Sequence, residues 1–174
     1  MGLIPGFCGA VVFTAVQFLV FFFVVVGTPL PQFRHVNGSL CMTLWGQTTK
    51  CNGIKYAAKG NAAFGCTRRT NNMNGGAVFA IVSIISTLLA LIFGILMLAR
   101  IQCAVIIPFI FTAVSMLTIL ICWACVAGVM TEKMCTSKMN YSISFDYGTG
   151  FVLMITAWCM QVFNFGLLVL IACF

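Results

Sequence analysis

The chain has very little charge for its length. Its 174 residues include nine lysines and arginines, two acidic residues and one histidine, so charged residues make up 6% of the sequence. A soluble domain of this size needs many more charged side chains to face water. With two acids and one histidine, no metal cluster, nucleotide-binding loop or nucleophile–base pair can be assembled. We therefore expect no enzyme, and no catalytic residue, cofactor or metal ligand.

Apolar residues make up 62% of the chain, and most of them lie in four long runs without Lys, Arg, Asp, Glu or His. The runs cover about residues 3–26, 77–99, 103–130 and 150–173. Each exceeds the roughly 20 residues that a helix needs to cross a bilayer. The sequence therefore predicts a single membrane domain over 1–174, an all-α four-helix transmembrane bundle. The first run lacks a basic N-terminal region, which favours an uncleaved signal-anchor over a cleaved signal peptide.

Two unequal loops, residues 27–76 and 131–149, lie on the same side of this bundle, and both termini lie on the other. The first half of the longer loop contains two Asn-Gly turn signals, which predict a small strand or hairpin unit. Its alanine-rich second half predicts a short helix, and residues 71–76 predict a flexible return to the membrane. On the opposite side, Arg100–Gln102 predicts a tight turn between the second and third runs.

The sequence contains conflicting signals about which side faces the cytosol. Eight of the nine basic residues lie in the two loops, so the positive-inside rule places the loops in the cytosol. The loops also hold four cysteines, an even set that suits an oxidising compartment. Each loop carries a glycosylation sequon, at Asn37 and at Asn140. We give these features more weight, and expect a plasma-membrane protein with extracellular loops and cytoplasmic termini.

The four loop cysteines are Cys41, Cys51, Cys66 and Cys135. Two cysteines ten positions apart can form a bridge when the chain reverses between them, and Gly46 favours such a reversal between Cys41 and Cys51. This predicts a Cys41–Cys51 disulfide, which leaves Cys66 and Cys135 as the second pair. Four cysteines permit three pairings, however, and the sequence alone does not choose among them.

The segment between the first two cysteines resembles the signature of the amastins, a family of trypanosomatid surface glycoproteins. That signature reads Cys, hydrophobic, Ser or Thr, hydrophobic, aromatic, Gly and a closing Cys, matched here by Cys41, Met42, Thr43, Leu44, Trp45, Gly46 and Cys51. Thr48 and Lys50 depart from the family pattern. The four-span plan, length and loop order also match. The resemblance implies a protein of the parasite plasma membrane, with extracellular loops and a structural or host-interaction role.

Two alternatives stay open. Amastins resemble claudins, so a claudin-like barrier or adhesion protein is one of them. The claudin pattern places its cysteines after a Leu-Trp pair, whereas Cys41 precedes it here, so only the architecture carries over. The second is a membrane thiol oxidoreductase that resembles vitamin K epoxide reductase, because Cys122 and Cys125 lie on one face of the third run. Structural packing is our preferred interpretation of these two thiols.

Several residues of the spans predict helix packing. Gln161 and Asn164 are one helical turn apart and can hydrogen-bond to another helix. In the second run, Ser86, Ala90 and Gly94 recur at four-residue steps, which lets two backbones approach closely. This stripe suits packing within the bundle or contact between copies.

The expected partners follow from the apolar runs and the basic loops. The lipid bilayer is the first partner. Because the basic residues lie between or beside apolar runs, they indicate loops and flanks and not a nucleic-acid surface. They favour anionic glycans or lipid head groups instead. A homo-oligomer or other membrane proteins are further candidates. The loop cations are Arg34, Lys50, Lys55, Lys59, Arg68, Arg69, Lys133 and Lys138.

Overall fold

The structure, a computed structural model, describes residues 6–36, 40–51, 55–99, 106–132, 134–135 and 144–173. Within these residues, four helices are long and apolar enough to cross a membrane. They are α1 (Gly6–Gly27), α3 (Thr67–Leu98), α4 (Ile106–Thr131) and α6 (Thr149–Cys173). The all-α membrane bundle is therefore confirmed. The expected tight turn at Arg100–Gln102 lies outside the described residues.

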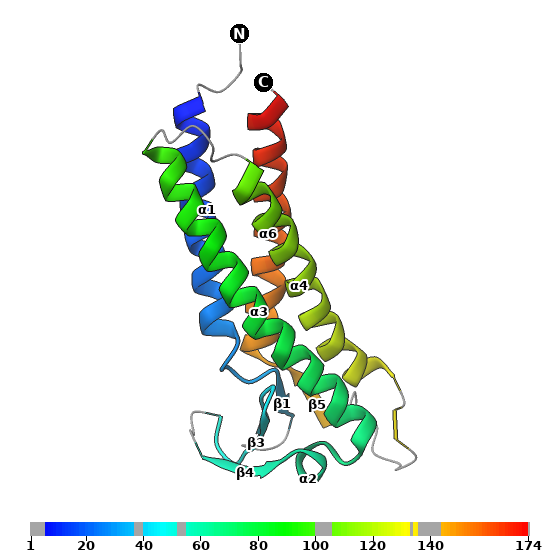
Figure 1. Cartoon of the computed structure of the whole chain (residues 1–174). Coiled ribbons are helices and arrows are strands. Elements are labelled where there is room, and N and C mark those ends of the chain that lie inside the picture. The colour runs from blue at the N-terminus through cyan, green and yellow to red at the C-terminus, as the bar shows by residue number, and fades with distance from the viewer. Residues whose placement is uncertain are drawn as a thin grey trace.

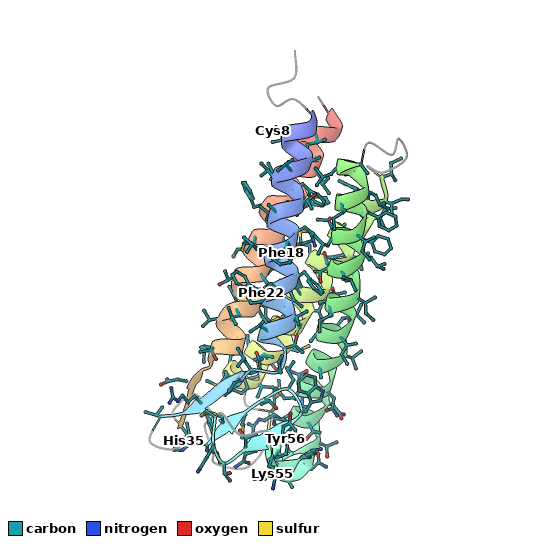
Figure 2. The ribbon with its side chains drawn as sticks, turned by 90° about the vertical axis from the view of Figure 1, so that its left-hand side faces the viewer. Cys8, Phe18, Phe22, His35, Lys55 and Tyr56 are labelled. Carbon is teal, nitrogen blue, oxygen red and sulfur yellow. A yellow bond between two sulfur atoms is a disulfide. The ribbon has the colours of Figure 1, made fainter. Side chains whose placement is uncertain are left out.

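The four helices form one elongated bundle, with both termini at one end and a small cap at the other (Figure 1). Helix α3 packs against α1 and α4, and α6 packs against the same two helices. Side chains such as Phe13, Val20 and Leu168 are fully buried between them. Phe18 and Phe22 are more than half exposed on α1 (Figure 2). Helices that are apolar on every face are typical of membrane spans, because lipid tails cover the outer side chains.

The cap is a five-stranded antiparallel sheet with the order β4-β3-β2-β1-β5. Strand β5 comes from the second loop and pairs with β1, where Phe33 lies opposite Tyr147. Both loops therefore build a single sheet, which confirms the expected small cap. The strands are β1 (Phe33–His35), β2 (Cys41–Met42), β3 (Gly46–Thr48), β4 (Tyr56–Lys59) and β5 (Phe145–Tyr147).

The alanine-rich part of the longer loop is a strand followed by one helical turn. After β4, Gly60 adopts a φ of 57°, and helix α2 then covers Asn61–Phe64. Gly65 ends α2 in the left-handed region, with a φ of 80°, a conformation that glycine adopts without the cost a side chain brings. The expected short helix is therefore present but limited to four residues.

Helix α3 begins at Thr67, so the expected flexible return over residues 71–76 is wrong. Gly76 of that segment lies against α4. A Cβ atom placed on Gly76 would lie 3.5 Å from the Cys122 carbonyl oxygen and 3.6 Å from the Cys125 Cβ. Asn72 donates its amide to the Cys125 carbonyl at 3.3 Å. At 1.5 Å per residue, a helix of 32 residues is about 48 Å long, so its first turns extend beyond the bilayer core into the cap.

Candidate functional site in the cap

The signature segment forms the tight β2–β3 hairpin. The Thr43 backbone N–H donates to the Gly46 carbonyl at 2.9 Å, and the Thr43 hydroxyl donates to the same oxygen at 3.1 Å. The Trp45 N–H in turn donates to the Thr43 hydroxyl oxygen at 3.3 Å. A hydroxyl that both donates and accepts stabilises a turn in this way, which explains a Thr at this position.

The neighbouring strand β4 leaves no room for a side chain at Gly46. A Cβ atom on Gly46 would lie 2.5 Å from the Ala58 carbonyl oxygen of β4, closer than real Cβ contacts. Any side chain at this position would therefore push β4 away from β3. Trp45, beside it, is half-buried and packs against the hydrophobic core.

Leu44 lies at the tip of the hairpin and points into the bundle. Its side chain is fully buried, and its Cδ2 atom lies 3.5 Å from the position of a Cβ on Gly76 of α3. Met42, also buried, belongs to the same core cluster as Val126 of α4. The hairpin therefore closes the cap end of the bundle with apolar side chains.

Two disulfides fix this cap. Cys41–Cys51 closes the hairpin, with Cα atoms 5.1 Å apart, and the Thr48 hydroxyl donates to the Cys41 carbonyl at 3.2 Å. Cys66–Cys135 joins the start of α3 to the segment that follows α4. The disulfide-stapled cap expected from the sequence is confirmed. The two sequon asparagines, Asn37 and Asn140, lie outside the described residues.

Gln32 connects three parts of the fold, although the sequence did not indicate it. Its backbone N–H donates to the Met42 carbonyl at 2.7 Å, and its carbonyl accepts from the Gly148 N–H at 2.7 Å. Its buried side-chain amide donates to the carbonyls of Gly27 and Leu30, each at 3.1 Å. It ties the end of α1 to β2 and to the start of α6. In the sequence, Gln32 looks like any other loop glutamine. Its partners are brought to it by the tertiary structure, so no local pattern identifies it.

Of the loop cations that the structure describes, one does not lie on the expected basic surface. Arg69 is 4% exposed and donates Nη1 to the Phe64 carbonyl at 3.1 Å, so it belongs to the interior of the cap. Its helical position explains this, because Arg68 and Arg69 point in different directions from α3. Arg68 is exposed, and its Nη2 lies 3.9 Å from an oxygen of Glu132. The loop cations Lys133 and Lys138 lie outside the described residues.

The other described cations lie on the sheet. Arg34 of β1 is exposed opposite Asp146 of β5, so opposite charges face each other across the strands. Lys50, Lys55 and Lys59 are exposed around β3 and β4, at the other side of the sheet. The Lys59 ammonium lies 4.9 Å from the centre of the Tyr56 ring. Among the residues that the structure describes, the unpaired basic side chains of the cap are therefore concentrated near β3 and β4.

Within the membrane, buried amides join the helices. Asn164 donates Nδ2 to Gln17 Oε1 at 2.8 Å, and Gln17 donates Nε2 to the Thr87 carbonyl at 3.3 Å. Gln161 donates Nε2 to the Ser115 hydroxyl at 2.5 Å. These bonds connect α6 to α1, α1 to α3, and α6 to α4. Gln161 and Asn164 thus make the interhelical contacts expected of them.

The stripe of small residues faces the interior of the bundle. Ser86 and Ala90 are buried, and a Cβ atom on Gly94 would lie 3.0 Å from Cε1 of Phe13 and 3.1 Å from Oγ1 of Thr14. The sequence left two roles open for this stripe, packing within the bundle and contact between copies. In the structure, Gly94 of the stripe packs α3 against α1.

Cys122 and Cys125 are free thiols in α4. Cys122 is buried beside Gly76, and Cys125 is half-buried. The four cap cysteines, which a thiol relay would use, are joined in pairs to each other. Within the described residues, no group of three His, Cys, Asp or Glu side chains could hold a metal ion. Both residues lie against Gly76 of α3, so they form part of the contact between α3 and α4.

Four apolar spans and a disulfide-stapled sheet built from two loops define a multi-pass membrane protein with a structured cap. The family model described as amastin surface glycoprotein matches residues 18–168, which include the whole cap and parts of all four spans. The chain belongs to the amastin family. No curated protein matches it.

Proposed function

We propose that this protein displays its cap on the outside of the plasma membrane, with both termini in the cytosol, and serves a structural or host-contact role without catalysis. The observation that carries the proposal is the pair of disulfides at one end of the bundle. Structural disulfides persist in oxidising compartments and are rare in the cytosol. Membership of a surface-glycoprotein family supports the same orientation.

The lysines allow a direct test of this orientation. All five lysines of the chain lie in the two loops, and Lys55 and Lys59 are exposed on the cap. A membrane-impermeant amine reagent applied to intact cells should label the peptides that contain Lys55 and Lys59. The N-terminal amine should react only after permeabilisation. Labelling of the N-terminal amine alone on intact cells would place the cap in the cytosol, as the positive-inside count predicts.

We further propose that the β4 side of the cap contacts anionic partners, such as sulfated glycans or acidic lipid head groups. Arg34 and Arg68 lie near acids, whereas Lys50, Lys55 and Lys59 gather around β4. Lys55 lies next to Tyr56, at the end of the molecule opposite the two termini (Figure 2). An exposed cluster of one sign attracts anions with a strength that falls as salt increases.

Binding of the purified protein to immobilised heparin and to anionic liposomes, across a salt series, tests this proposal. The double variant Lys55→Glu/Lys59→Glu should bind more weakly at low salt. Arg34→Glu/Lys50→Glu makes the same change in net charge with only one substitution near β4, so it should weaken binding less. Equal loss in both double variants would indicate net charge alone, and absence of binding at low salt would remove the electrostatic role.

A further inference from the structure

A groove of about 470 Å³ runs between α3 and α4 at the cap end of the bundle. Its α3 side contains Arg68 and Asn72, and its α4 side extends from Leu120 to Glu132. Over twelve residues, a helix rises about 18 Å, so the groove passes from the membrane surface into one leaflet. Its volume lies within the range of small-molecule sites.

The lower part of the groove is apolar and open to lipid. Ile121 and Ala124 are exposed on α4, and Leu120 is partly exposed beside them. Gly128 lines the groove without a side chain. A Cβ atom there would lie 3.4 Å from Asn72 Nδ2 and 3.7 Å from Met134 Cε, so a larger side chain at this position would extend into the groove. Leu120, Ile121 and Ala124 give a hydrocarbon chain an apolar wall to lie along, below the point where Asn72 donates to the Cys125 carbonyl.

Among the described residues, the upper part of the groove carries two opposite charges. Arg68 Nη2 lies 3.9 Å from Glu132 Oε2, and the two side chains are 71% and 62% exposed. Glu132 is one of only two acids in the whole chain. An exposed pair at this distance is weakly bound, so each group is able to take another partner. A guanidinium suits a phosphate, and a carboxylate suits an ammonium that can donate N–H bonds.

We propose that this groove binds one glycerophospholipid of the surrounding bilayer, with a zwitterionic head group that combines a phosphate and a primary amine. Arg68 holds the phosphate, Glu132 accepts from the ammonium, and an acyl chain lies along Leu120 and Ala124 past Gly128. The charge pair and the apolar wall below it match the two halves of such a lipid. A quaternary ammonium lacks the N–H donors, so choline lipids bind less well.

The test measures retained lipid. The full chain is reconstituted in bilayers with equal amounts of phosphatidylethanolamine, phosphatidylcholine and phosphatidylglycerol, released in mild detergent and analysed by native mass spectrometry. The wild type should keep one phosphatidylethanolamine in preference to the others. Gly128→Leu should fill the groove and reduce this retention roughly tenfold. Gly166→Leu is the matched control, because a Cβ on Gly166 meets nothing within 4 Å.

Variants of the charge pair test the head group separately. Glu132→Gln should abolish the preference for the primary amine, and Arg68→Gln should reduce retention of all three lipids. Both side chains are exposed, so these variants keep the fold even where Gly128→Leu does not. Retention that follows the bilayer composition would overturn the proposal, as would a preference for the anionic lipid or unchanged selectivity in Glu132→Gln.

Discussion

Substitution of Leu44 by alanine tests whether the signature hairpin holds the cap to the bundle. The side chain is fully buried and lies against α3 at Gly76. The change removes three carbon atoms, which at ~0.8 kcal/mol for each buried methylene gives a transfer loss of about 2.4 kcal/mol. A residual cavity adds to this loss, because the helices on either side cannot fully collapse. We therefore expect Leu44→Ala to lower the free energy of unfolding by about 2–5 kcal/mol.

The assay is reversible unfolding in mixed micelles of a mild detergent and sodium dodecyl sulfate, followed by circular dichroism. Val36→Ala is the control, because Val36 also lies in the cap but is 54% exposed. Removal of methyl groups at an exposed position should change stability by no more than about 0.5 kcal/mol. If Leu44→Ala were no more destabilising than Val36→Ala, the hairpin tip would not be packed into the bundle, and the cap would be an independent surface layer.

Three further substitutions test other contacts by the same unfolding assay. Cys41→Ser opens the hairpin disulfide and should cost about 3 kcal/mol in the chain-entropy picture; equal stability of this variant and the non-reduced wild type would contradict the bridge. Gly94→Val places methyl groups against Phe13 and should cost about 1–3 kcal/mol, whereas Gly166→Val has open space; equal effects would refute close packing there. Asn164→Leu removes an interhelical hydrogen bond and should cost about 0.6–2 kcal/mol; a more stable variant would show that the amide is not needed for the bundle.

The spans and the stapled cap could be predicted because their signals are local. Uninterrupted apolar runs identify membrane helices from composition alone. Gly46 between Cys41 and Cys51 favoured a bridge across a chain reversal, but the sequence left three pairings open, and the structure contains Cys41–Cys51 and Cys66–Cys135. The amides of Gln161 and Asn164 could be assigned to interhelical bonds because a polar group in a membrane span requires a partner inside the protein.

The remaining features depend on contacts between distant segments. Residues 71–76 are rich in Asn and Gly and therefore indicated a flexible connection. In the structure they belong to α3, where Gly76 lies against α4 and Asn72 bonds to the Cys125 carbonyl. From the sequence, Arg69 was expected to be a surface charge. In the structure, its guanidinium is buried in the cap and donates to the carbonyl at the end of α2. Composition cannot distinguish these uses, because the partner that decides each one lies elsewhere in the fold.

The position of the signature residues limits where this protein can contact a partner. Leu44 and Met42 are buried, Thr43 is used in the turn, and Gly46 has no room for a side chain. These four signature residues are therefore used for folding, whereas Trp45 is half-buried and Lys50 of the same segment is exposed. The proposed anion contact lies beside this hairpin, at β4, which is one of the two edge strands of the sheet. Variation along β4 should consequently change binding without loss of the fold, whereas changes at the hairpin tip should affect both.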